Sequence, residues 1–106
     1  MPKYLIRGQY NPEGLRGLQK DKASGRMGAA IAAVESVGGK VDCGYFALGE
    51  DDVCAIVDCP DNITAAALGI AVSAAGLLRT RITALLTAEE VDQALAKSVD
   101  YRLPGG

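Results

Sequence analysis

The most chemically suggestive residues are the arginines of the segment Leu77–Leu86. Polar and apolar side chains alternate along it, so a strand would place Arg79, Arg81 and Thr83 on one face. The other face would carry Leu78, Thr80, Ile82 and Ala84. A guanidinium group is planar and always charged, and its geometry matches that of a carboxylate or a phosphate. The spacing therefore predicts a strand with anion-binding side chains on one face and an apolar face toward helices.

A second alternating segment, Lys3–Tyr10, adds to this set. Its Arg7 and Gln9 lie on the face opposite Tyr4 and Ile6. If Ile6 faces the helices and the two strands are neighbours, both polar side chains join the arginines of the other strand. Three nearby guanidinium groups repel one another unless an anion or carboxylates lie between them. Tyr45, an aromatic residue of the predicted strand Val41–Leu48, is a further candidate. The candidate ligand-binding residues are therefore Arg7, Gln9, Tyr45, Arg79 and Arg81.

This cluster has two interpretations. In the first, it binds a small anionic ligand inside a cavity between subunits. In the second, its arginines pair with Asp or Glu across a subunit interface, or stand in solvent. Arginine is common at interfaces for reasons unrelated to ligands, so the sequence leaves both open.

The acidic run Glu50–Asp52 is a weaker candidate. It is predicted at a hairpin tip, where acidic residues usually serve solubility and turn formation. Paired carboxylates can bind a divalent cation, but the regularly spaced oxygen ligands of a calcium loop are absent. We predict no metal site.

Three cysteines and the lack of any histidine limit the available chemistry. Without histidine, no Ser-His or Cys-His catalytic pair can form, and a thiolate zinc site lacks an obvious fourth ligand. Cys43 and Cys54 fall on paired strands and could approach each other, although the sequence leaves their register open. Cys59, beside Pro60 at a strand end, is predicted to be the more exposed and reactive thiol. No phosphate-binding glycine motif occurs, and we expect no cofactor.

Composition indicates one domain spanning residues 1–106. The chain is 49% hydrophobic but only 5% aromatic, and its net charge is −2, which argues against a nucleic-acid or anionic-membrane partner. The N-terminus lacks the long apolar core of a secretory signal. The uncharged stretch Asn62–Leu78 is typical of a buried helix rather than a membrane span. We therefore expect a cytoplasmic protein.

The elements that would position these side chains alternate between strands and helices. Caps and turn residues set their limits: Asn11 and Pro12 begin a helix, Gly38 ends it, and the box Thr87–Glu90 opens a last helix. A break is predicted in the first helix near residues 21–25. The predicted strands are Lys3–Tyr10, Val41–Leu48, Val53–Val57 and Leu77–Leu86; the helices run from Asn11 to Gly38, from Asp61 to Gly76 and from Thr87 to near Lys97. In the last helix Val91 and Leu95 are expected to point inward, and residues 98–106 form a polar tail.

This order, β-α-β-β-α-β plus a C-terminal helix, predicts an α+β ferredoxin-like sandwich. Right-handed crossovers would give an antiparallel sheet in the order 4-1-3-2 with both main helices on one face. The segment Val53–Val57 is apolar on both faces, as is typical of a central strand covered on both sides. We therefore expect a second subunit to cover the face that the helices leave open.

The chain resembles the GYD-domain family of small bacterial and archaeal proteins along most of its length. The segments that carry the resemblance are Met1–Ile6, Gly14–Leu18, Val34–Lys40, Leu48–Val53, Ile56–Asn62, Ser73–Gly76 with Arg79–Thr80, and Leu85–Glu90. The resemblance implies a homodimeric, ferredoxin-like fold of the dimeric α+β barrel type, and it carries over no catalytic residue. One departure is Asp51, which stands before Asp52 where the family motif has an aromatic. A pocket lined by that aromatic would here be more polar or closed differently.

Two functions follow from these observations. The first is a homo-oligomeric binding or assembly module for a small anionic molecule at the sheet face. The alternative is a cofactor-independent enzyme of the dimeric α+β barrel type, similar to a monooxygenase or an isomerase. That alternative rests on fold analogy alone, and the missing histidine removes the base that such enzymes commonly use.

Overall fold

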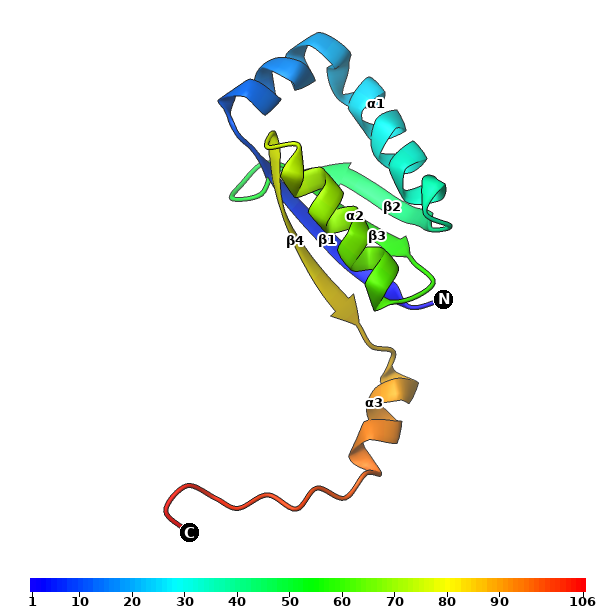
Figure 1. The fold of residues 1–106 in the computed structure, drawn as a ribbon, viewed down its shortest axis with the longest axis vertical. Coiled ribbons are helices and arrows are strands. Elements are labelled where there is room, and N and C mark those ends of the chain that lie inside the picture. Colours follow the sequence, from blue (N-terminus) through cyan, green and yellow to red (C-terminus); the bar gives the residue numbers. More distant parts are fainter.

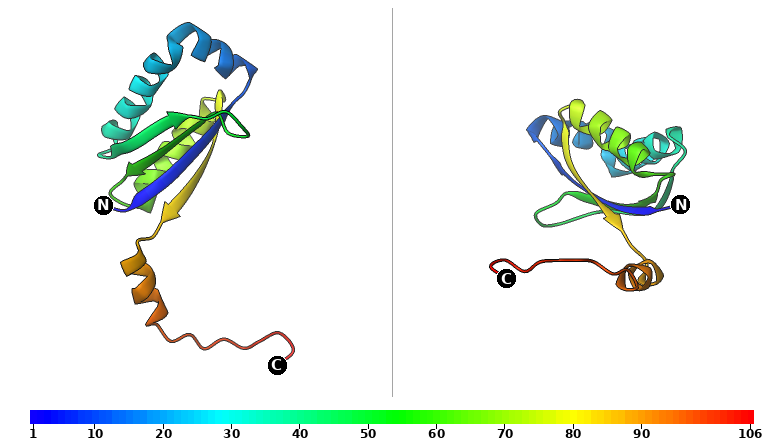
Figure 2. Two further views of the ribbon diagram at one scale, coloured as in Figure 1. Left: turned by 180° about the vertical axis from the view of Figure 1, so that it is seen from behind. Right: turned by 60° about the horizontal axis from the view of Figure 1, so that its bottom comes forward.

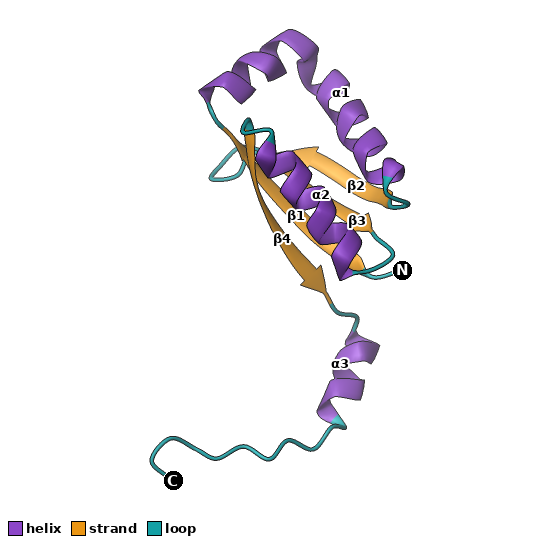
Figure 3. Cartoon of the chain, in the orientation of Figure 1, coloured by secondary structure: helices purple, strands orange, loops and turns teal.

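The computed structural model describes residues 1–106 and has a βαββαβα order (Figure 1, Figure 3). The strands are β1 (Lys3–Tyr10), β2 (Lys40–Phe46), β3 (Val53–Asp58) and β4 (Leu78–Leu85). The helices are α1 (Pro12–Ser36), α2 (Asn62–Ala74) and α3 (Ala88–Leu95). Every predicted element is present, and the strand limits differ from the predicted ones by at most two residues.

Helix α1 begins and ends at the residues whose chemistry predicts it. The Asn11 side chain accepts a hydrogen bond from the Gly14 N–H at 2.7 Å, which caps the first turn. The predicted break is confirmed at Lys22, whose φ of 65° is non-helical. The helix stops before Gly38, whose φ of 81° is readily adopted only without a side chain.

The four strands form one antiparallel sheet in the order β2-β3-β1-β4. Read from the other edge, this is the predicted order 4-1-3-2, so the ferredoxin-like arrangement is confirmed. Helices α1 and α2 cover the same face of the sheet (Figure 2). The apolar strand β3 lies between β2 and β1, in the central position that its composition predicts.

The core lies between this sheet and the two helices. Its buried hydrophobic residues are Tyr4, Val34, Val57, Cys59, Ala65 and Leu68. The Tyr4 hydroxyl donates a hydrogen bond to Asn62 Oδ1 at 2.5 Å, so its one polar group is satisfied at the start of α2. An apolar cavity of about 110 Å³ remains between the helices and the sheet, with Met27 and Ile82 among its lining residues.

Helix α2 is not the fully buried helix that its lack of charge predicts. Only Ala65 and Leu68 are buried, while Ile63 and Ile70 on the outer side are 81% and 69% exposed. One sheet face and one flanking helix cannot surround α2, so its outer side stays apolar and uncovered. No helix in the structure combines the length and hydropathy needed to span a bilayer.

Helix α3 departs further from its prediction. Val91 and Leu95, expected to point inward, are 41% and 77% exposed, because α3 continues beyond the end of β4 instead of packing on the sheet (Figure 1). The radius of gyration of 17.0 Å reflects this extension, since a compact chain of this length has about 13 Å. The capping box that opens α3 is confirmed, with both of its hydrogen bonds present.

Candidate functional site

The uncovered side of the sheet, called here the open face, carries the predicted arginine cluster. Directly paired residues point to the same side of a sheet. Arg7 pairs with Arg81, and Gln9 pairs with Arg79 in the next row. Ile6 packs against the core on the helix side, so Arg7, the next residue, lies on the open face. The other three residues of the cluster lie on the same face, as predicted.

Tyr45 shares this face but not this cluster. It pairs with Cys54, which in turn pairs with Arg7, so one row crosses the sheet from Tyr45 to Arg81. Because β2 and β4 are the two outer strands, three strand spacings of roughly 4.8 Å separate Tyr45 from Arg81. The structure therefore brings together Arg7, Gln9, Arg79 and Arg81 and leaves Tyr45 at the opposite edge.

Arg81 is neutralised within its own chain. Its guanidinium donates to both carboxylate oxygens of Asp51, at 2.8 and 2.9 Å. These hydrogen bonds, together with the negative charge of Asp51, raise the pKa of Arg81 above its ordinary value. The Asp51 carboxylate thus neutralises one of the clustered positive charges.

The acidic hairpin tip is not a freely solvated turn, which corrects its prediction. Gln9 Nε2 donates to the Glu50 carbonyl at 2.6 Å, and the Tyr10 N–H donates to Asp52 Oδ2 at 2.9 Å. The Asp52 N–H donates in turn to the Gly8 carbonyl at 2.8 Å. These contacts, together with the Asp51 pair, fold the loop between β2 and β3 against β1 and β4. The structure contains no group of three or more His, Cys, Asp or Glu side chains placed to hold a metal ion.

The folded loop encloses a small polar pocket on the open face. Its volume is about 190 Å³, and its lining consists of Gln9, Glu50, Arg79 and Arg81. Unlike that of Arg81, the side chain of Arg79 forms no hydrogen bond or ion pair within the chain. The pocket therefore contains one neutralised guanidinium and one that is free.

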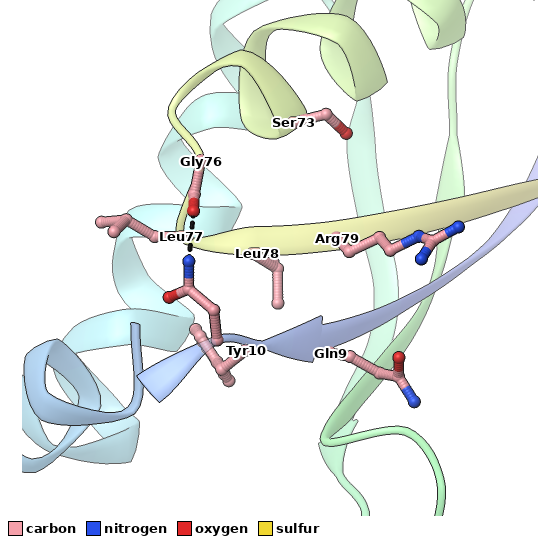
Figure 4. A pocket seen from close by; sticks show the side chains of 8 residues that line it. Gln9, Tyr10, Ser73, Gly76, Leu77, Leu78 and Arg79 are labelled. Carbon is pink, nitrogen blue, oxygen red and sulfur yellow. Dashed lines mark hydrogen bonds between the residues drawn. The ribbon is translucent and has the colours of Figure 1, made fainter. Parts of the chain in front are cut away.

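Arg79 also lines a second, more open pocket of about 360 Å³, shown in Figure 4. Arg79 and Gln9 lie at one end of it, and Gly76 and Leu77 at the other. Asn11 fixes that far end, because its Nδ2 donates to the Gly76 carbonyl at 2.5 Å and its N–H donates to the Leu77 carbonyl at 3.0 Å. Tyr10 and Ser73 complete the polar lining. The two pockets share Gln9 and Arg79, near the end of β1 and the start of β4.

The opposite end of the open face has a different charge pattern. Lys3 Nζ lies 3.0 Å from Asp58 Oδ1 and 3.2 Å from Asp42 Oδ2. The hydrogen bonds to Asp58 and Asp42 raise the pKa of Lys3. The positive charge of Lys3 is balanced by two carboxylates, whereas Arg7 and Arg79 have no carboxylate partner. The unpaired positive charge of the open face therefore lies at Arg7 and Arg79.

The cysteines differ from their prediction. Cys59, expected to be the exposed thiol, is completely buried, and this burial raises its pKa. Cys43 pairs with Ile56 and Cys54 with Tyr45, so the two thiols are diagonal neighbours on the open face and both are free. They are half-buried and are the more accessible thiols of the chain.

Two features of the site escape sequence reasoning. The Asp51–Arg81 pair joins residues 30 positions apart, and no local sequence pattern links the two. The pocket beyond Arg79 depends on Asn11, whose helix-capping role is readable from sequence but whose contact with Gly76 is not.

Comparison with known protein families shows a match along most of the chain. The model of the family described as "GYD domain" matches residues 4–95, from the second residue of β1 to the end of α3. No curated protein matches the chain.

Proposed function

The chain belongs to the GYD-domain family, and from this premise we propose that it is a homo-oligomeric binding module. In this proposal the open face is covered by a second subunit, and a small anionic molecule binds at the Arg79 end of that face. The ligand class is a carboxylate or a phosphate, because a guanidinium donates two parallel hydrogen bonds to either.

The observation that carries the ligand proposal is the contrast between two neighbouring arginines. Arg81 is held by Asp51 at 2.8 Å, whereas Arg79 has no partner in the same polar pocket. Gln9 lies opposite Arg79 and can donate a further hydrogen bond if its link to the Glu50 carbonyl yields. A small anion in this pocket would supply the charge that Arg79 lacks.

The assembly proposal rests on the apolar residues of the open face. Leu5, Ile56 and Leu85 are only half-buried, and Tyr45 is 67% exposed. Contiguous exposed apolar surface rimmed by polar groups is typical of a protein interface. A pair of subunits meeting through this face corresponds to the dimeric α+β barrel arrangement.

Substitution of Arg79 tests the ligand site. In thermal melts with increasing inorganic phosphate, the unmodified protein is expected to gain stability as ligand binding stabilises the folded state. Arg79→Ala should abolish this gain. Arg16→Ala, which removes another exposed arginine from α1, should leave it unchanged. An equal phosphate response in all three proteins, or loss of the oligomer in Arg79→Ala with the phosphate response intact, would refute the ligand site.

One observation favours the alternative of a cofactor-independent enzyme. Arg79 and Tyr10 line the same 360 Å³ pocket, so a charged and a phenolic group could position one substrate there. Native mass spectrometry of the purified protein would reveal a retained organic molecule. Chemical conversion of that molecule would favour the enzyme, and its unchanged release would favour the binding module.

A further inference from the structure

The C-terminal arm, defined as residues 86–106, carries apolar side chains that nothing in its own chain covers. Six of the fourteen exposed large hydrophobic residues belong to it. They are Leu86, Val91, Leu95, Val99, Tyr101 and Leu103. So many apolar side chains on a short projecting segment are typical of a surface that binds another protein.

The arm lies on the same side of the sheet plane as the open face. In Figure 2, right, helices α1 and α2 are above the sheet, and α3 and the tail are below it. In Figure 1 the arm continues beyond the end of β4, and the molecule reaches 57 Å along its longest axis. An arm in this position points toward the space that a second subunit on the open face would occupy.

The link between β4 and α3 holds the arm away from its own sheet. Only Leu86 and Thr87 separate the two elements. Thr87 Oγ1 accepts from the Glu90 N–H at 3.1 Å, and Glu90 Oε1 accepts from the Thr87 N–H at 2.9 Å. This capping box satisfies two free backbone donors and so sets the residue at which α3 begins. With only two residues between the elements, α3 starts directly beyond the end of β4 and does not lie over the sheet (Figure 1).

Helix α3 and the open face are complementary in polarity and charge. Val91 and Leu95 are four residues apart and form one apolar stripe, with Asp92 beside it. The helix contains three carboxylates and no basic residue. On the open face, half-buried Leu5 lies one row from Arg7, a guanidinium without an ion-pair partner.

We propose that α3 of one copy docks on the open face of a second copy, in a reciprocal exchange of C-terminal arms. The stripe of Val91 and Leu95 packs on Leu5 and Ile56, and Asp92 pairs with Arg7. This inference rests on the proposed homo-oligomer and differs from the barrel arrangement in one respect: the partner's α3, rather than the partner's sheet, covers Leu5 and Ile56. A reciprocal exchange is closed by a two-fold axis, so it stops at a dimer.

Sedimentation velocity on full-length variants tests this exchange. Leu95→Asp places a charge in the stripe and should weaken the dimer at least about tenfold. Ile70→Asp makes the same change on the exposed outer side of α2 and should leave the dimer unchanged. Asp92→Arg alone and Arg7→Asp alone should each weaken the dimer, and the double variant, which restores the opposite charges, should recover it.

The outcomes separate this inference from the function on which it rests. A dimer that Leu95→Asp leaves intact, or that Ile70→Asp disrupts instead, overturns the arm exchange while the homo-oligomer stands. Both proteins can also be melted at a dilution at which they are monomeric. A lower melting temperature of Leu95→Asp than of the unmodified protein would show that the arm folds onto its own chain, which also overturns the exchange. A chain that is monomeric at every concentration overturns the homo-oligomer itself.

Discussion

The two faces of the sheet are built from the same four strands, yet they have opposite characters. On the helix-covered face, Tyr4 and Val57 are 2% and 1% exposed. On the open face, Leu5 and Ile56 are half-buried, and Arg7 and Arg79 are exposed. Strand residues alternate between faces, so neighbours in sequence serve different purposes.

We infer from this difference that the helix-covered face stabilises the fold and that the open face serves the proposed binding. Apolar burial, the main source of folding free energy, is concentrated between the sheet and the helices. The open face instead carries unpaired guanidinium groups and half-buried apolar side chains that contribute little to the fold of one chain. Changes on the helix-covered face should therefore lower stability, and changes on the open face should alter association and anion binding.

The largest expected effect is on the helix-covered face. Leu68 is 7% exposed on the inner side of α2, so Leu68→Ala should lower the free energy of unfolding by about 3 kcal/mol through lost burial and a residual cavity. Ile63→Ala on the outer side of the same helix should cost about 0.5 kcal/mol or less. Urea denaturation of both variants measures this difference, and equal losses would contradict the location of the core between α2 and the helix-covered face.

A change on the open face should alter binding with little effect on stability. Asp51→Asn removes the negative charge that neutralises Arg81 and leaves two free guanidinium groups in the polar pocket. The Arg81 side chain of this ion pair is exposed to solvent, and exposed ion pairs contribute little to stability. Phosphate affinity, measured by isothermal titration calorimetry, should rise in Asp51→Asn and stay unchanged in the tail variant Asp100→Asn. Weaker phosphate binding in Asp51→Asn would show that Arg81 is not part of the anion site.

The smallest effect concerns acid stability at the start of α2. The Thr64 backbone N–H and hydroxyl donate to Asp61 Oδ1 at 2.8 and 2.7 Å, and these hydrogen bonds lower the pKa of Asp61. A carboxyl whose pKa is lower in the folded state stabilises the fold above its unfolded pKa and loses that contribution as pH falls through the folded pKa. The unmodified protein should therefore lose free energy of unfolding below about pH 4 as Asp61 is protonated. Asp61→Asn, which has no such carboxyl, should lose less over the same pH range. Thermal melts from pH 7 to pH 2 measure this, and parallel curves for both proteins would contradict it.

The fold was predictable because its signals are local. The alternation in β1 and β4, the cap at Asn11 and the box at Thr87 each act within a few residues, and the sheet order follows from the connection rules. The arginine cluster was predictable for the same reason, since alternation assigns each side chain to a face once the helix side is known.

What the sequence could not predict depends on long-range packing. Cys59 has the local setting of an exposed strand end, yet the chain buries it beneath α2 and the N-terminus, where its N–H donates to the Pro2 carbonyl at 3.1 Å. Gly14 weakens a helix by propensity, but a side chain there would collide with the Leu77 carbonyl. The outward position of α3 is likewise not readable from sequence, because the spacing of Val91 and Leu95 predicts an apolar stripe but not the surface on which it packs.

The most direct test of the central claim, that the open face is a subunit interface, is the rate of thiol labelling as a function of protein concentration. Cys43 and Cys54 lie on the open face, and Cys59 lies in the core as an internal reference. Maleimide labelling, assigned to each cysteine by peptide mass spectrometry, should slow at Cys43 and Cys54 as concentration rises and the face becomes covered. Cys59 should label slowly at every concentration. Labelling of Cys43 and Cys54 that is equally fast from dilute to concentrated protein would contradict the claim.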